Sequence, residues 1–196
     1  TFELGSTVVL YPDLEIAGAG RDATFLDGGD AVQVLSRAGG EGPIEIRDLS
    51  IERGYSEGVS GAFSGSSGTT TFRNLAVRQC RSRTRGGAIS SNGSIEIFDS
   101  EFELNTASGH PSGFNSGGAI YMTSGDLLVV RSVFDRNRVI GVSGELYGGA
   151  IHFASYGTLE IDRSTFSANS AGYSGGAVMA LFGEQALITD STFHGN

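Results

Sequence analysis

Hydrophobic and polar residues alternate along short segments of this chain, and each segment ends in glycine or in a polar turn. In one of them, Ile44 and Ile46 alternate with Glu45 and Arg47. A period of two residues predicts a β-strand that buries one of its faces. None of the segments has the period of an amphipathic helix, so the pattern predicts an all-β chain.

The alternating segments recur every 25 to 32 residues, which is typical of a solenoid. Alignment of the repeats gives a column of large apolar residues: Phe25, Ile51, Val77, Phe102, Phe134, Phe166 and Phe193. A second apolar column lies five residues earlier and comprises Ile46, Phe72, Ile97, Val129, Ile161 and Ile188. A third belongs to another strand and comprises Phe63, Ile89, Ile120, Ile151 and Val178. Each repeat therefore supplies about three short strands.

Stacking the repeats would place like residue on like residue and build parallel sheets around one continuous core. We therefore predict a single-stranded parallel β-helix of about seven coils, right-handed because parallel crossovers nearly always are. Residues 1–196 are expected to form a single domain, with irregular N-terminal coils over residues 1–35. Both ends of the sequence lie within repeats, so we expect the chain to be a fragment of a longer protein.

The extra residues of the longer repeats fall at one corner of the coil. The two longest insertions, Thr106–Ser116 and Arg138–Tyr147, belong to consecutive coils, so we expect them to protrude side by side. Long loops on a stiff scaffold often carry binding residues. The aromatic or polar residues in or beside these loops are therefore predicted to be exposed contacts for a partner: His110, Phe114, Tyr121 and Tyr147.

Apolar residues also occupy some outward positions of the predicted strands. Phe98 and Val130 share one outward column, and Leu128 and Leu187 share the adjacent one. Apolar clusters on a surface often mark a partner site. We expect Phe98, Leu128 and Val130 to contact another chain.

Two short motifs alternate in a fixed order along the repeats. Gly-Gly-Ala followed by Ile or Val occurs at Gly86–Ile89, Gly117–Ile120, Gly148–Ile151 and Gly175–Val178. Phe-x-x-Asn occurs at Phe102–Asn105, Phe134–Asn137, Phe166–Asn169 and Phe193–Asn196. On these motifs the chain resembles the polymorphic outer membrane protein repeat family. The resemblance implies a surface-exposed or secreted β-helix, often with an adhesive role and without a catalytic residue set.

Composition narrows the range of functions. The net charge is −9, and all 13 basic residues are arginine, which argues against general nucleic-acid binding. The single cysteine, Cys80, cannot form an internal disulfide. No run of apolar residues is long enough to cross a membrane as a helix, and no signal peptide is present, so any signal or anchor is expected outside this sequence.

The polar columns are interpreted as structural. Asn105, Asn137, Asn169 and Asn196 are expected to stack at a coil corner, where asparagine tolerates a left-handed backbone. A serine column, Ser100, Ser132, Ser164 and Ser191, is expected to be an inward stack of small residues, because leucine replaces it in earlier coils. The Asp48, Asp99 and Asp190 column also carries arginine, which indicates charge alternation on a solvated face.

The sequence predicts no cofactor. His110, His152 and His194 occupy different columns on different coils, so they are not expected to share a metal ion. His152 lies in an outward column and is expected to be exposed. Arg81, Arg83 and Arg85 form a short basic loop, which either pairs with Glu57 and nearby aspartates or meets an acidic glycan or a partner's carboxylates.

Two classes of function remain open from the sequence. The first is a non-catalytic scaffold or adhesion-type module, cell-surface or secreted, that contacts another protein or a surface glycan, either alone or as a structural subunit of a self-associated or larger assembly. The alternative is a carbohydrate-active enzyme or a polysaccharide-binding module. Glycoside hydrolysis needs two carboxylates within reach of one substrate, and the sequence offers only scattered candidates such as Asp135 and Glu145.

Overall fold

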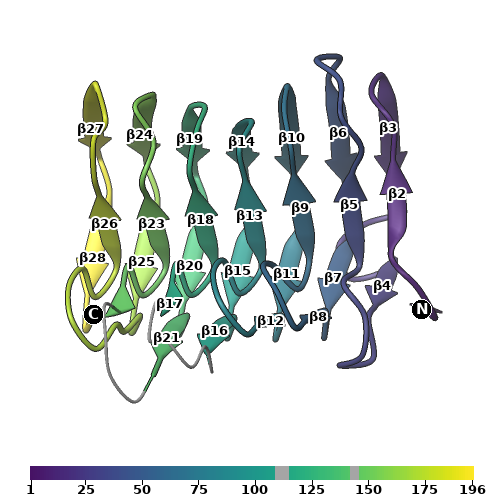
Figure 1. Cartoon of the computed structure of the whole chain (residues 1–196), viewed down its shortest axis with the longest axis horizontal. Coiled ribbons are helices and arrows are strands. Elements are labelled where there is room, and N and C mark those ends of the chain that lie inside the picture. Colours follow the sequence, from purple (N-terminus) through teal and green to yellow (C-terminus); the bar gives the residue numbers. More distant parts are fainter. Residues whose placement is uncertain (109–114, 142–145) are drawn as a thin grey trace.

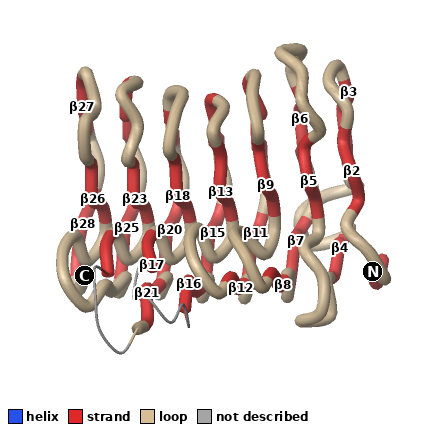
Figure 2. The backbone as a smooth tube through the Cα atoms, in the orientation of Figure 1, coloured by secondary structure: helices blue, strands red, loops and turns tan. Residues whose placement is uncertain are grey.

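The computed structural model describes residues 1–108, 115–141 and 146–196. These residues form strands, turns and bends without a helix (Figure 2). The chain winds into seven stacked coils, each of which contributes one strand to each of three long parallel sheets. The two termini lie at opposite ends of the stack (Figure 1). The predicted parallel β-helix is confirmed, and its handedness stays a prediction.

Three long sheets carry the coils. The upstream sheet consists of β2 (Val8–Leu10), β5 (Leu35–Arg37), β9 (Phe63–Gly65), β13 (Ile89–Ser91), β18 (Ile120–Met122), β23 (Ile151–Phe153) and β26 (Val178–Ala180). The middle sheet consists of β3 (Leu14–Ala17), β6 (Ile44–Arg47), β10 (Thr69–Arg73), β14 (Ser94–Phe98), β19 (Leu127–Val130), β24 (Thr158–Asp162) and β27 (Gln185–Thr189). The downstream sheet consists of β1 (Phe2–Glu3), β4 (Phe25–Asp27), β7 (Ser50–Glu52), β11 (Ala76–Arg78), β15 (Glu101–Glu103), β20 (Val133–Asp135), β25 (Thr165–Ser167) and β28 (Thr192–His194).

Two smaller sheets form at the corner that carries the insertions. The corner sheet consists of β8 (Tyr55–Ser56), β12 (Arg81–Ser82), β16 (Thr106–Ser108) and β21 (Arg138–Ile140). Beside it, β17 (Asn115–Ser116) pairs with β22 (Leu146–Tyr147). The sequence predicts loops here, because these segments lie in insertions of unequal length and the alignment of the columns does not extend to them.

The core lies between the three long sheets and follows the predicted columns. One cluster of buried apolar side chains runs from Leu10 to Ala177. The rings of Phe102, Phe134 and Phe166 in this cluster and of Phe193 in the last coil are stacked, with neighbouring centroids 4.7 to 4.8 Å apart. That separation equals the spacing of neighbouring strands in a sheet, so identical rings at identical positions stack without adjustment.

The register of the first coil differs from the sequence alignment. Leu26, rather than Phe25, pairs with Ile51 in the downstream sheet. Leu26 packs against the core, whereas Phe25 pairs with Ser50 at an outward position. The alignment on phenylalanine is wrong by one residue here, because the irregular turn before β4 shifts the chain and a one-residue shift exchanges the two faces of a strand.

The asparagine column is a buried hydrogen-bonded ladder at the corner after the downstream sheet. Asn105, Asn137 and Asn169 are at most 1% exposed. The left-handed backbone falls on the residue before each of them, at Leu104, Arg136 and Ala168, with φ between 51° and 56°. The predicted stack is confirmed, but its reason is wrong: the preceding residue makes the turn, which directs the asparagine side chain inward.

The serine column is a second ladder inside the coils. The hydroxyl oxygen of Ser132 accepts a hydrogen bond from the backbone N–H of Ser100 at 3.1 Å, and its hydroxyl donates to the carbonyl of Val130 at 2.9 Å. Ser100 and Ser164 make the same pair of bonds in their own coils. The inward stack of small residues predicted from the sequence is confirmed, and it satisfies backbone groups at the corners.

The Gly-Gly pair solves two different steric problems. The first glycine, such as Gly148, has a φ of 61°, which favours residues without a Cβ. A Cβ on the second, Gly149, would overlap the carbonyl oxygen of Gly176 in the next coil. The first glycine is therefore required by its own left-handed turn, in which a Cβ would also overlap the Ile151 carbonyl oxygen of the same coil, and the second is required by the close stacking of coils.

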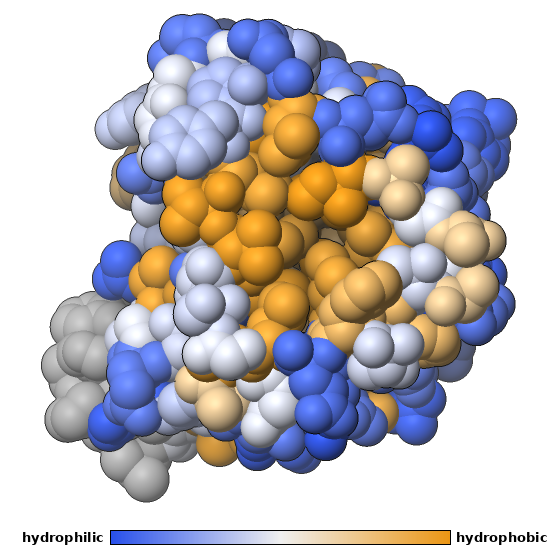
Figure 3. Space-filling view, turned by 90° about the vertical axis from the view of Figure 1, so that its right-hand side faces the viewer, coloured by the Kyte–Doolittle hydropathy of each residue, from blue (hydrophilic) through white to orange (hydrophobic). Residues whose placement is uncertain are grey.

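Apolar side chains are open to solvent at both ends of the stack. At the N-terminal end they cover much of the cross-section (Figure 3), and they include Val8, which is 40% exposed, and Leu14, which is 39% exposed. In the last coil Ile188 and Phe193 are 47% and 41% exposed. These residues belong to the same inward columns that are buried in the middle coils.

Candidate functional site

The outward face of the middle sheet carries a groove centred on Leu128. Glu96, Leu128 and Glu160 lie side by side on β14, β19 and β24. They point outward because the neighbours of each along its strand, such as Leu127 and Val129, are fully buried. The alternation within three adjacent strands therefore places an apolar side chain between two carboxylates.

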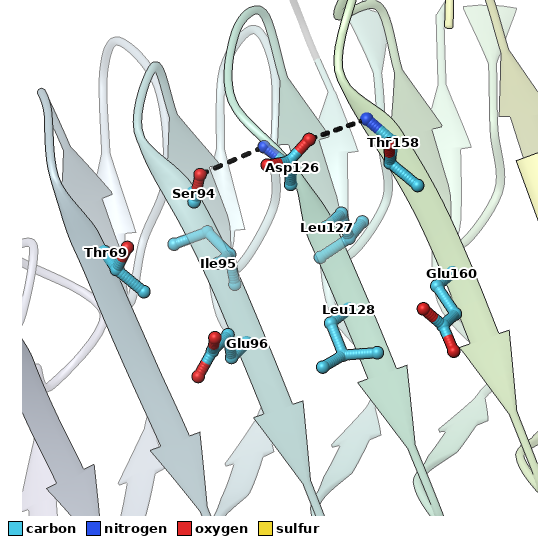
Figure 4. Close-up of a pocket in the computed structure, with 9 residues that line it drawn as sticks. All are labelled: Thr69, Ser94, Ile95, Glu96, Asp126, Leu127, Leu128, Thr158 and Glu160. Carbon is cyan, nitrogen blue, oxygen red and sulfur yellow. Dashed lines mark hydrogen bonds between the residues drawn. The ribbon is translucent and has the colours of Figure 1, made fainter. Parts of the chain in front are cut away.

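The groove has a volume of about 320 Å³, and its rim is rich in hydroxyl and carboxylate groups. The rim is formed by Thr69, Ser94, Asp126 and Thr158, and Figure 4 shows three of them in line above Glu96, Leu128 and Glu160. The backbone N–H of Asp126 donates to Ser94 Oγ at 3.1 Å, and the backbone N–H of Thr158 donates to Asp126 Oδ1 at 2.7 Å. These bonds tie the turns of three consecutive coils together.

Glu96 and Glu160 are two strand spacings apart, which places their backbones about 9.6 Å from each other. Glu96 is half-buried and accepts a hydrogen bond from the Thr71 hydroxyl at 3.0 Å, whereas Glu160 is exposed. The side chains thus offer hydrogen-bond acceptors on both sides of an apolar floor. This arrangement can receive a ligand that has many hydroxyl groups.

An exposed aromatic pair continues the surface beyond the rim at Thr158. Tyr156 is 72% exposed and stacks with Phe182 of the next coil, with ring centroids 5.5 Å apart. Phe182 is 63% exposed and has a φ of 66°, a left-handed conformation that bulky residues rarely adopt. Neither ring is needed to fill the core, so the pair is a candidate part of the site.

Three residues are expected from the sequence on an apolar outer face, and two of them, Phe98 and Val130, are covered by neighbouring side chains. The guanidinium of Arg73 lies 4.5 Å from the centre of the Phe98 ring. Val130 is 8% exposed, and Leu128 is half-buried at the floor of the groove. The predicted outward columns are confirmed by the strand register, but Leu128 is the member that faces a hollow.

Tyr121 and His152 are buried, contrary to the predicted exposure. They are 8% and 6% exposed, and their rings meet edge to face at 5.4 Å. Tyr147 is half-buried and packs on the other side of His152, while Arg85 lies over Tyr121. Side chains from the insertion corner cover this column, which the alternation within a strand cannot reveal. His110 and Phe114 lie outside the described residues.

His152 is held in its neutral form. Burial lowers the pKa of its imidazole to about 4, and the positive charge of Arg85 acts in the same direction. Neither ring nitrogen has a hydrogen-bond partner in the part of the chain that the structure describes. The ring therefore behaves as an aromatic packing residue.

The other charged candidates are engaged in ion pairs. Arg83 pairs with Glu57 at 2.7 Å and Arg81 with Asp30 at 2.5 Å, which confirms the predicted pairing of that loop with Glu57 and a nearby aspartate. Arg131 makes a two-pronged contact with Asp99 of the preceding coil, and this hydrogen bonding lowers the pKa of the Asp99 carboxyl. Asp99 and Arg131 are thus an opposite-charge pair within that column, but charges do not alternate along all of it, because Arg163 follows Arg131 and pairs with Asp162 instead.

Asp135, one of the two carboxylates named as catalytic candidates, is engaged in other contacts. Asp135 pairs with Arg136 at 2.6 Å and accepts a hydrogen bond from Ser167. Glu145 lies outside the described residues. Within the described ranges, no group of three or more His, Cys, Asp or Glu side chains could hold a metal ion.

Sequence reasoning missed the groove, although a signal for it was present. Glu45, Glu96 and Glu160 recur at one outward position, and Leu128 interrupts the series. Asp126 and Thr158 lie in turns, which the alignment of strands leaves out. Only the stacking of the coils brings these turns beside the strand positions.

Comparisons of the chain with protein-family models, curated proteins and solved structures give no match. Among the described residues, no helix is long and apolar enough to span a membrane. The assignment of the candidate site therefore rests on the geometry of the described residues alone.

Proposed function

We propose that this chain is a non-catalytic β-solenoid scaffold of a secreted or cell-surface protein, and that its groove around Leu128 binds a neutral surface glycan. The observation that carries the proposal is the groove itself, with Leu128 between the carboxylates of Glu96 and Glu160. Carboxylates and hydroxyls at a shallow groove accept hydrogen bonds from sugar hydroxyls, while Leu128 contacts the apolar face of a sugar ring.

The neighbouring aromatic pair supports a carbohydrate ligand. Tyr156 lies two residues before Thr158 of the rim and, with Phe182, presents ring faces to solvent. Aromatic faces pack well against the C–H face of a sugar, and tyrosine adds a polar tip. A glycan chain that runs from the groove toward the last coils would meet these rings.

The stiffness of the stack suits a scaffold. Each coil is joined to the next by three sheets, and the coils from Leu75 and Cys80 onward are joined also by the serine and asparagine ladders. The alternating Gly-Gly-Ala and Phe-x-x-Asn motifs further support a place in the polymorphic outer membrane protein repeat family, and with it the adhesive role and the surface location proposed here.

A glycoside hydrolase is the second candidate, because Glu96 and Glu160 flank one groove. Inverting enzymes hold their carboxyl groups about 6.5 to 9.5 Å apart, close to the backbone spacing of these two residues. We favour binding without cleavage because Glu160 is exposed and Glu96 accepts its hydrogen bond from a neutral hydroxyl.

The test is a screen of neutral polysaccharides for binding and for release of reducing ends. The proposal expects binding without cleavage, and weaker binding by Tyr156→Ala. Reducing ends that the wild type releases and that Glu96→Gln and Glu160→Gln do not release would establish the enzyme instead. Absence of binding to every neutral glycan would contradict the proposed ligand.

A further inference from the structure

The corner sheet carries a second candidate binding surface. Arginine side chains line it, so it suits acidic ligands. Tyr55, Arg81, Thr106 and Arg138 occupy equivalent positions on its four adjacent strands. The strands are spaced by about 4.8 Å, so these side chains form a line parallel to the axis of the stack. We name Tyr55, Arg81, Arg83 and Arg138 the arginine track.

Two hollows meet along this line and share Asp30 and Arg81. One has a volume of about 280 Å³ and is also lined by Gln79, Leu104, Thr106 and Arg138. The other has a volume of about 400 Å³ and is also lined by Tyr55, Ser82, Arg83 and Ser108. Together they form an extended surface with guanidinium, hydroxyl and amide groups and one aromatic ring.

The guanidinium groups of the track can accept an anion. Arg81 and Arg83 are each paired with one carboxylate, Asp30 and Glu57, but about half of each arginine side chain is exposed. Exposed ion pairs contribute little free energy, so a second carboxylate can join or replace the first. Within the described residues Arg138 has no acidic partner, and its Nε lies 3.5 Å from Thr106 Oγ1.

We propose that the arginine track binds an acidic polysaccharide, with the carboxylates of uronic acid units on Arg81, Arg83 and Arg138. A guanidinium receives a carboxylate through two parallel hydrogen bonds. The hydroxyls of Ser82, Thr106 and Ser108 and the amide of Gln79 suit sugar hydroxyls, and the Tyr55 ring suits a sugar face. Arg81 and Arg138 lie two strands apart, about 9.6 Å, which suits charges repeated along a polymer.

The charge balance favours this ligand over nucleic acid. Asp30 and Glu57 lie among the three arginines, and the whole chain has a net charge of −9. A polyphosphate with one charge per nucleotide needs a more uniformly basic surface. A uronic acid polymer is less densely charged and offers hydroxyl groups to the polar side chains between the arginines.

The arginine track is independent of the groove around Leu128. The corner sheet and the outer part of the middle sheet lie at opposite ends of each coil (Figure 1). A variant of one surface should leave binding at the other unchanged. Failure of this proposal and failure of the proposed neutral-glycan site can therefore be told apart.

The experiment titrates the full chain with polygalacturonate, with its methyl-esterified neutral form, and with poly-glutamate. We expect polygalacturonate to bind with an affinity that falls as salt is added, and we expect poly-glutamate not to bind. Any binding of the esterified form, as a neutral glycan in the groove around Leu128, should be unaffected by changes to the track arginines. Arg138→Gln should weaken binding about tenfold and Arg81→Gln by a similar factor. Asp30→Asn should strengthen it, because Arg81 loses its competing carboxylate.

Arg163→Gln is the matched control, because Arg163 is an exposed, ion-paired arginine on another part of the coil. It should bind like the wild type. The proposal is overturned if polygalacturonate does not bind, if Arg81→Gln and Arg138→Gln bind it as well as the wild type, or if these variants weaken binding of the esterified polymer by the same factor. Equal binding of poly-glutamate would assign the track to an acidic peptide.

Discussion

The side-chain amide of Asn105 donates a hydrogen bond to Oδ1 of Asn137 in the next coil at 3.0 Å. The same oxygen accepts from the backbone N–H of Asn105 at 3.1 Å, and Nδ2 of Asn137 donates to the carbonyl of Phe102 at 2.9 Å. One buried side chain thus satisfies backbone groups on two segments of the preceding coil. This relationship repeats from coil to coil and explains why the motif ends in asparagine.

Replacement of a central rung should destabilise the fold. Asn137→Ala removes the four hydrogen bonds of a fully buried side chain and leaves the Phe102 carbonyl and the Asn105 amide groups without their partner. Each unsatisfied buried group costs about 1 to 3 kcal/mol, so we expect the free energy of unfolding to fall by about 3 kcal/mol or more. Urea unfolding followed by circular dichroism measures it. Exposed Asn92, changed to alanine, is the control and should have little effect.

The loss of unfolding free energy on replacing a stacked phenylalanine should depend on its position in the stack. Phe134 is fully buried between two other rings, so Phe134→Ala should cost about 3 to 5 kcal/mol. Phe193, at the end of the stack, is 41% exposed, and Phe193→Ala should cost clearly less. Equal losses of unfolding free energy would show that the stack does not contribute through burial.

His152 should make stability depend on pH. Its pKa is about 4 in the folded chain and near 6.5 when unfolded, so the unfolded chain binds the proton more readily. The stabilisation is fully present above about pH 6.5 and is lost as the pH falls toward 4, by about 3 kcal/mol at most. His152→Phe, which keeps an aromatic ring, should flatten the unfolding free energy across this range. An unchanged slope would show that other groups cause the dependence.

Much of the fold could be predicted from the sequence because solenoid coils repeat their contacts. The Phe102 and Ile97 columns specify strands, and Gly149 must be a glycine for the coils to approach. The asparagine and serine ladders could also be recognised as structural. The failures arose where the repeat is irregular, as at Phe25, or where insertions of unequal length prevent an alignment, as in the corner sheet.

The candidate site was less predictable, because it depends on contacts between different parts of the coil. Tyr121 and His152 occupy outward positions, yet Arg85 and Tyr147 from the neighbouring corner cover them. Leu128 looked like part of an apolar patch, but Arg73 covers Phe98 and two glutamates flank Leu128. Alternation along a strand gives the direction of a side chain and not what lies over it.

The most direct test of the proposed function is the affinity of Leu128→Arg for the neutral glycan that binds the wild type. Arginine would fill the groove and pair with Glu96 or Glu160, so binding should weaken about tenfold or more, with circular dichroism unchanged. Val133→Arg, an exposed substitution on the downstream sheet, should bind normally. Full affinity of Leu128→Arg would contradict the account and place glycan binding elsewhere on the coils.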